Sequence, residues 1–184
     1  GVGWDDSGLW SEGILDRLDQ VDVFVPNDVE AMNYTRTGSA EEAARQLGRY
    51  VELAVVTRGR EGVVAYQRRT GELVQIDAVP MRAADPTGAG DVFVAALMSS
   101  FDYGWPLPQR LRFANLCAAL SVQSLGGARS APTFAMIERF LTSQTVADED
   151  LIHDELPEGD QLLRVDWKPD QEWDPIIDWL RAVG

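Results

Sequence analysis

The segment at residues 83–97, AADPTGAGDVFVAAL, places a turn of small residues directly before an apolar run. Gly88 and Gly90 permit backbone angles that larger residues avoid, and they let a ligand approach the main chain closely. The apolar run predicts a helix, and the N–H groups of a helix's first turn form an anion-binding site. Asp91 at the start of this helix also suits the helix dipole, so a structural and a catalytic interpretation of its carboxylate are both open.

Short β-branched runs alternate with segments of helical periodicity along most of the chain. We predict strands at 21–25, 53–57, 63–67 and 72–76, the last two joined as a hairpin by the turn RRTG. We predict helices at 7–20, 39–50, 89–101, 108–123, 133–141 and 174–183. This order predicts an α/β layered domain with a mainly parallel sheet and one antiparallel hairpin.

Three of the predicted helices begin with capping signals. Ser7 or Ser11 is suited to cap the first helix. Ser39 and Glu42 have the spacing of a capping box at the second. Asp174, followed by a proline, is suited to cap the last.

The composition changes after about residue 142. Residues 143–184 hold twelve acidic and three basic side chains, so they carry nine of the chain's fourteen net negative charges. They also hold three of the six tryptophans. We therefore divide the chain into a domain at 1–142 and an acidic extension at 143–184. The aromatic residues of the extension are expected to dock on the domain, and the alternative is that they bind a partner or stabilise a dimer.

The charge and the rare residue types exclude several classes of function. A net charge of −14 would be repelled by a nucleic-acid backbone or an anionic membrane. No apolar run approaches the roughly 20 residues that span a bilayer. Cys117 is the single cysteine and lies in an apolar stretch, which indicates a buried residue and favours a cytoplasmic protein. His153 is the only histidine, so a zinc site is not expected. The Walker A sequence is absent.

The stretch from Asp85 to Met98 resembles the second signature of the PfkB family of carbohydrate kinases, which have the ribokinase-like fold. Three further stretches resemble family elements in the same order: VPNDVEA at 25–31, VVTRGREG at 55–62, and FANLCAALSVQSLGGARSAPT at 113–133. The resemblance covers roughly residues 1–141. It implies a three-layer α/β/α domain with a mainly parallel sheet, of which residues 1–142 form the C-terminal, nucleotide-binding and catalytic part. The N-terminal half and the lid of the family are missing from this sequence.

The resemblance implies ATP and Mg²⁺ as cofactors and gives each matched residue a role. Asp91 would be the general base, and Gly88, Ala89 and Gly90 would form the anion hole for the transferred phosphoryl group. The residues expected beside the nucleotide are Thr57, Gly59, Gly62, Asn115 and Ala118. A plain turn is the alternative for the first three of these.

The same resemblance implies two cation sites. Asn27 and Glu30 would help to hold Mg²⁺ through water, and the alternative is that they cap a helix after Pro26. The second cation site would bind K⁺, and its expected ligands are Asp85, Thr87, Gly126 and Ser130. The alternative is that Asp85 caps the turn.

The function implied is an ATP-dependent kinase for a hydroxyl of a sugar or related polyol. Ribose, fructose, a keto-deoxy sugar acid, a nucleoside and inositol all remain open as acceptors. A sequence without the N-terminal half is expected to lack most of what selects the substrate, to expose an apolar sheet edge, and to favour a homodimer. The isolated piece is therefore expected to be inactive by itself or nearly so. The alternative function is a non-catalytic scaffold protein that binds a partner through its acidic tail. The complete glycine turn and Asp91 argue against that alternative.

Overall fold

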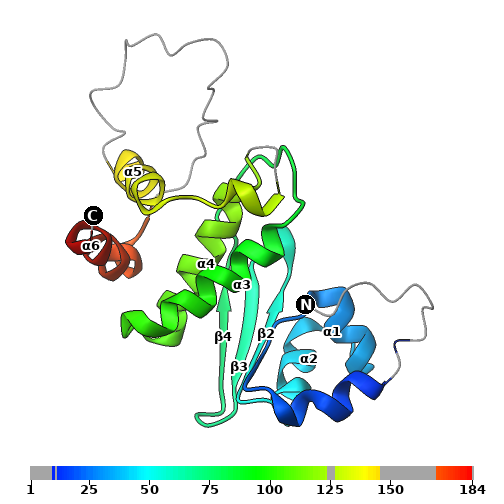
Figure 1. Ribbon diagram of the computed structural model, residues 1–184. Coiled ribbons are helices and arrows are strands. Elements are labelled where there is room, and N and C mark those ends of the chain that lie inside the picture. The colour runs from blue at the N-terminus through cyan, green and yellow to red at the C-terminus, as the bar shows by residue number, and fades with distance from the viewer. Residues whose placement is uncertain (1–9, 11, 124–126, 146–168, 184) are drawn as a thin grey trace. The chain divides into compact units, whose positions relative to one another are not determined.

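The computed structural model describes residues 10, 12–123, 127–145 and 169–183. Its contacts divide the chain into two compact units, Gly1–Ala78 and Val79–Gly184, which we describe one at a time (Figure 1). Several predictions lie outside the described residues: the caps Ser7 and Ser11, the K⁺ ligand Gly126, and His153. The predicted boundary at 142/143 lies within a helix of the second unit, α5 (Phe134–Thr145).

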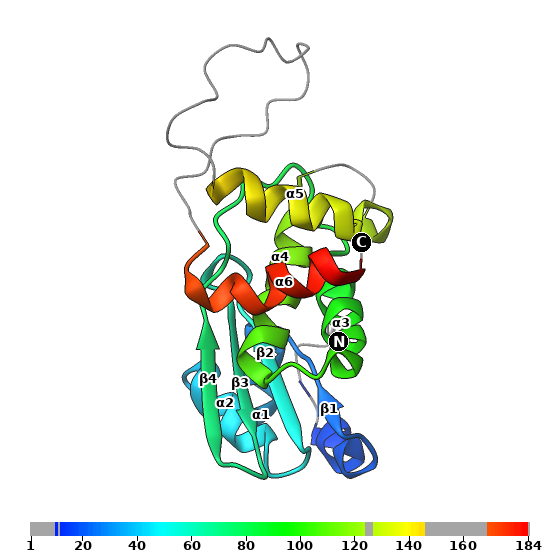
Figure 2. The same cartoon turned by 90° about the vertical axis from the view of Figure 1, so that its left-hand side faces the viewer.

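The first unit is built on a four-stranded sheet in the order β1 (Val23–Phe24), β2 (Leu53–Thr57), β3 (Val63–Gln67) and β4 (Glu72–Ile76), which Figure 2 shows side by side. β1 and β2 pair in parallel, whereas β2–β3 and β3–β4 pair antiparallel. The expectation of a mainly parallel sheet is therefore wrong for the described strands. The reason is the loop Arg58–Gly62, because a five-residue connection can only reverse the chain, and a parallel crossover needs a dozen or more residues.

The parallel pair in this unit is joined by two helices, α1 (Asp28–Thr35) and α2 (Ala40–Leu47). The sequence predicted α2 outright, whereas α1 was expected only in the alternative that Asn27 and Glu30 cap a helix after Pro26. Ser39 caps α2 by accepting a 3.2 Å hydrogen bond at Oγ from the Glu42 N–H. The reciprocal half of the expected capping box is absent, because the Glu42 carboxylate accepts instead from the Gly38 N–H at 3.1 Å.

The core of the first unit lies between its helices and one face of the sheet. The small residues Ala43 and Ala44 of α2 are fully buried and let the helix approach Ala54 and Val56 of β2 closely. The predicted helix at 7–20 is, in its described part, the 3₁₀ helix η1 (Glu12–Gln20). The predicted strand at 21–25 shortens to β1, with Val21 exposed before it.

The second unit is helical. It contains α3 (Ala89–Ser99), α4 (Leu107–Ser121), α5 and α6 (Asp174–Val183), with 3₁₀ turns η3 (Ser100–Tyr103), η4 (Gly127–Ser130) and η5 (Gln171–Trp173). The predicted helices at 89–101, 108–123, 133–141 and 174–183 are confirmed within a few residues at their ends. Asp174 is the first residue of α6 and not its cap; Asp170 caps η5 by accepting from the Glu172 N–H at 3.0 Å.

The helix α6 of the acidic extension docks on the rest of this unit and runs beside α5 (Figures 1 and 2). Trp173, Ile176 and Leu180 are buried. The ring of Trp179 lies 4.1 Å from that of Tyr103 between centroids, and Glu172 forms an ion pair with Arg112 of α4. The expectation that the aromatic residues of the extension dock is therefore confirmed for Trp173 and Trp179. None of the helices described is long and apolar enough to cross a membrane.

Candidate functional site

The turn before α3 has the geometry that its glycine predicts. Gly88 is the N-cap of α3 and has φ +79° and ψ −2°, in the left-handed region that favours glycine. The first full helical hydrogen bond runs from the Val92 N–H to the Gly88 carbonyl at 3.0 Å. The Ala89 N–H makes only a long contact of 3.3 Å to the Pro86 carbonyl. The first-turn N–H groups thus lie at the helix end where a helix binds anions.

Asp91 is the third residue of α3 and is exposed. Its side chain lines an open pocket of about 500 Å³ between α3, α4 and the start of α5. The other described lining residues are small or apolar, among them Val92, Phe113 and Phe134, so Asp91 is the one charged group on the described walls. A carboxylate at this place can accept a proton from a hydroxyl held against it.

Cys117 lies on α4 at the same pocket, but only 4% of it is exposed. Burial raises the pKa of the Cys117 thiol from 9.0 to about 12, because the thiolate would lose its hydration. The prediction of a buried cysteine is confirmed, and the raised pKa makes the thiol no candidate nucleophile near neutral pH.

The described K⁺ candidates lie on two loops that are both anchored at the C-terminal end of α4. The Val122 carbonyl accepts from the N–H groups of Ala84 at 2.7 Å and Asp85 at 3.1 Å, while Ser130 Oγ donates to the Ser121 carbonyl at 2.7 Å. The negative end of a helix dipole favours a cation at this position. Asp85 also accepts at Oδ1 from the Thr87 N–H at 2.9 Å, which is the turn-capping role that formed the alternative.

Asn27 and Glu30 form a complete capping box at α1. Asn27 Oδ1 accepts from the Glu30 N–H at 2.8 Å, and Glu30 Oε2 accepts from the Asn27 N–H at 3.0 Å. The Glu30 side chain is buried, with 6% of the residue exposed. The alternative interpretation of this pair as a helix cap is thus confirmed. A carboxylate has further lone pairs, so the cap does not by itself prevent a contact to a hydrated ion.

Thr57 and Asn27 are brought together at the ends of β2 and β1. They form an isolated parallel bridge, and the Thr57 N–H donates to the Pro26 carbonyl at 3.0 Å. The carboxyl ends of parallel strands are where open α/β sheets bind ligands. Within the first unit, the predicted nucleotide loop after Thr57 and the predicted Mg²⁺ pair Asn27 and Glu30 therefore begin at the carboxyl ends of two neighbouring parallel strands.

The two glycines of the loop after Thr57, Gly59 and Gly62, differ in why the structure requires glycine at their positions. Gly59 has φ +53° with open space where a methyl group would lie, whereas Gly62 has φ +86° and packs against the chain after β4. A Cβ at Gly62 would lie 2.0 Å from the Ile76 carbonyl oxygen, so no side chain fits there. A structural requirement thus accounts for Gly62 without any ligand.

The two residues of α4 that are expected beside the nucleotide lie about one helical turn apart. Asn115 is buried at 8% exposure and Ala118 is half-buried. Residues three apart share a helix face, so both lie on one side of α4.

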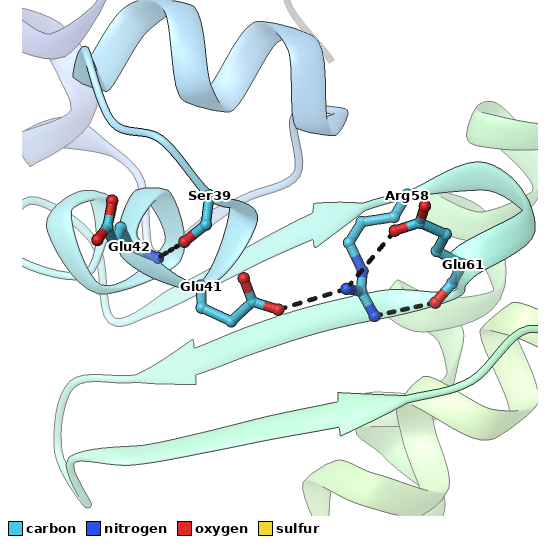
Figure 3. A network of polar contacts seen from close by, with 5 residues as sticks. All are labelled: Ser39, Glu41, Glu42, Arg58 and Glu61. Atoms are coloured by element: carbon cyan, nitrogen blue, oxygen red, sulfur yellow. Dashed lines mark hydrogen bonds and ion pairs between the residues drawn. The ribbon is translucent and has the colours of Figure 1, made fainter.

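Sequence reasoning missed Arg58, whose guanidinium contacts Glu41 of α2 and the Glu61 carbonyl (Figure 3). Its position between Thr57 and Gly59 carries no recognisable signal, because the partner Glu41 is seventeen residues away in the sequence. No cluster of three or more His, Cys, Asp or Glu suited to a metal ion occurs among the described residues.

Comparison with known proteins agrees with the fold. The family profile described as "pfkB family carbohydrate kinase" matches residues 4–134. The chain is 28% identical over 132 residues to a ribokinase of Schizosaccharomyces pombe, covering 67% of this chain and 41% of that protein. It is 33% identical over 96 residues to a cytidine kinase of Thermococcus kodakarensis, covering 52% of this chain and 34% of that protein.

A solved structure of a putative ribokinase II of E. coli in complex with ATP and Mg²⁺ superposes with a TM-score of 0.64 at 26% identity. The match covers 72% of this chain and 42% of that chain. The architecture is thus that of ribokinase-like kinases. The chain belongs to the pfkB family of carbohydrate kinases, and it spans about two fifths of the length of these relatives.

Proposed function

We propose that this chain carries the ATP-binding part and the general base of a kinase that transfers the γ-phosphate of ATP to a hydroxyl of a sugar or related polyol. The observation that carries the proposal is Asp91 in the first turn of α3, directly after the left-handed Gly88. Its support from outside the structure is the similarity to a ribokinase and a cytidine kinase, whose names give ribose and cytidine, both hydroxyl compounds, as acceptors.

In the proposed reaction, Asp91 accepts the proton of the acceptor hydroxyl while the oxygen forms a bond to the γ-phosphorus of ATP. The bond from that phosphorus to the bridging oxygen of ADP breaks, and ADP leaves with the electron pair. The backbone N–H groups of Gly88, Ala89 and Gly90 donate to the oxygens of the transferred group.

The residues proposed to contact ATP are Thr57, Gly59 and Gly62 in the first unit and, separately, Asn115 and Ala118 on α4 of the second unit. Support for the first group is its place at the carboxyl end of β2. The backbone of the glycine residues permits close approach of a ligand.

Mg²⁺ would neutralise charge on the phosphates of bound ATP. The donor set fits a hydrated ion better than a directly bound one, because Glu30 supplies a single carboxylate that also serves the cap of α1. Asn27 and Glu30 would then contact water molecules of the ion. Glu30→Gln, a conservative change, is expected to raise the Mg²⁺ concentration needed for half-maximal activity; an unchanged requirement would contradict this role.

K⁺ is proposed at Asp85, Thr87, Gly126 and Ser130. The support is the anchoring of both described loops at the C-terminal end of α4. Exchange of Na⁺ for K⁺ should raise turnover, and equal rates in the two salts would remove the proposal. A homodimer also stays a prediction, which light scattering can test.

The test of the base is Asp91→Asn in the natural protein that contains this sequence. We expect turnover to fall by about 10²–10⁴-fold, the range for loss of a general base, while the dissociation constant of ATP stays within a few-fold. Asp102→Asn is the matched control, because Asp102 is an exposed aspartate of the following turn η3. Near-normal turnover in Asp91→Asn would overturn the assignment of the base.

A further inference from the structure

Arg58 stands out in the first unit because a charged side chain of an exposed loop is itself nearly buried. Only 10% of the Arg58 side chain is exposed, while Gly59, Arg60 and Glu61 beside it are all exposed. A guanidinium keeps its charge at any physiological pH, so burial requires a partner.

Two kinds of contact involve the terminal nitrogens of this guanidinium, and Figure 3 shows both, whereas its Nε is buried and has no hydrogen-bond partner among the described residues. Across the unit, Nη1 lies 3.3 Å from Oε1 of Glu41 in the first turn of α2. Within the loop, Nη2 donates to the Glu61 carbonyl at 2.9 Å, and Nη1 lies 3.9 Å from the Glu61 carboxylate. Glu41 is the stronger countercharge, because its side chain is 37% exposed and that of Glu61 is 78% exposed, where water screens the pair.

These contacts act on a loop in which Gly62 packs against the chain after β4, whereas Gly59 faces open space. Gly59 and Gly62 both have positive φ, and glycine loses more conformational freedom on ordering than any other residue. The loop's own backbone bonds are three: Arg58 N–H to the Gly62 carbonyl at 2.8 Å, Glu61 N–H to the Arg58 carbonyl at 3.0 Å, and Gly62 N–H to the Gly59 carbonyl at 3.2 Å. The Arg58 side chain adds a bond to the far end of this turn and ties the turn to α2.

We propose that Arg58 and Glu41 form a brace that holds the loop at 57–62 in the conformation that receives ATP. Arg58 is a positioning residue in this role: its guanidinium orients the loop backbone and does not itself touch the nucleotide. The proposal rests on the proposed function for the nucleotide, but the brace can be measured without any ligand.

The experiment uses the whole 184-residue chain and the variants Arg58→Gln, Glu41→Gln and the double variant. The first readout is amide hydrogen exchange of Glu61 and Gly62 without ligand. The second is the dissociation constant of ATP by calorimetry. Loss of a hydrogen bond to a charged group is expected to speed loop exchange and weaken ATP binding each by roughly tenfold. The double variant should add little to Arg58→Gln, because Arg58→Gln already removes the contact to Glu41.

Arg68→Gln is the matched control. Arg68 pairs with Glu52 at 3.5 Å near the other end of the same strands, and its side chain is 51% exposed. It should leave both readouts unchanged. If Arg58→Gln does not fold, Glu41→Gln decides alone, because Glu41 lies on the helix surface.

Four outcomes separate the brace from the proposed function. Faster loop exchange with weaker ATP binding in both single variants supports the proposal. Unchanged loop exchange in Glu41→Gln overturns the brace. Faster exchange with unaltered ATP affinity overturns the positioning role. Failure of the unsubstituted chain to bind ATP would overturn the proposed function and the positioning role with it, while the exchange data would still decide whether Arg58 and Glu41 hold the loop.

Discussion

At the scale of single residues, Gly62 and Gly59 must be glycine for different reasons. A side chain at Gly62 would clash with the chain after β4, whereas Gly59 has only a positive φ. Gly62→Ala would push a methyl group to 2.0 Å from the Ile76 carbonyl, so β4 or the loop must move. We expect a loss of about 3 kcal/mol or more in the free energy of unfolding. Gly59→Ala meets open space and should lose only about 1 kcal/mol, the cost of a left-handed alanine. Urea unfolding of both variants measures the difference, and equal losses would contradict this account.

Cys117 makes the stability depend on pH in a defined direction. Its pKa is about 12 in the folded chain and 9.0 without burial, so between these values the unfolded state binds fewer protons than the folded state. The contribution to stability is fully present below pH 9 and is lost as the pH rises toward 12. Between pH 8 and pH 10, the free energy of unfolding of the unsubstituted chain should fall by about 1.4 kcal/mol more than that of the Cys117→Ala variant. Parallel pH dependence of the two proteins, followed by urea unfolding, would show that the thiol is not the source.

At the scale of elements, the sequence predicted the strands of the first unit well where apolar runs were bounded by turn residues. The bounds of β2, β3 and β4 agree with the prediction, because each is a five-residue run between glycine-containing or charged turns. The antiparallel pairing of β2 with β3 was not predicted. The segment RGREG at 58–62 was interpreted only as a loop beside the nucleotide, but it also reverses the chain direction between these two strands. Direction of pairing depends on loop length as much as on strand pattern.

The candidate site was predictable only where the motif itself sets the local geometry. Gly88 and Asp91 follow this rule, because a glycine N-cap and an acidic first turn are local features. Asn27 and Glu30 show the limit: a capping box and a metal-binding pair use the same two residue types, and the sequence left both open. Arg58 was missed because its function in the loop depends on α2, which only the fold brings near.

The docking of α6 is expected to contribute to the stability of the second unit. Trp179 contacts Tyr103, Trp105 and Phe134, with ring centroids 4.1, 5.2 and 5.4 Å away. Because the indole is half-buried, Trp179→Ala should lower the free energy of unfolding by about 2 kcal/mol, below the range for fully buried rings. Val183→Ala is the control, since Val183 is 52% exposed at the end of the same helix. Near-UV circular dichroism during thermal unfolding measures both, and equal midpoints would mean that the aromatic contacts add nothing.

At the scale of the whole molecule, the net charge of −14 opposes the approach of the proposed ligand, because ATP is also an anion. Nine of these charges come from residues 143–184, outside every motif assigned to the nucleotide. Charges separated by more than about 8–10 Å are screened at physiological ionic strength, whereas contacts at the site itself are screened much less. Added salt should therefore weaken the long-range repulsion more than the local attraction, and ATP should bind faster and more tightly at higher salt.

We expect the association rate of ATP to rise by about two- to fivefold between roughly 20 and 200 mM choline chloride, a salt that avoids any effect of K⁺. Adenosine is the control ligand, since it lacks the phosphates and its binding should barely respond to salt. Stopped-flow fluorescence of the intrinsic tryptophans measures both rates. A fall in the ATP association rate with salt would contradict the prediction. It would mean that the arginines near the loop at 57–62 contribute more to the electrostatic potential at the site than the acidic surface does. The potential there would then be positive although the net charge of the molecule is negative.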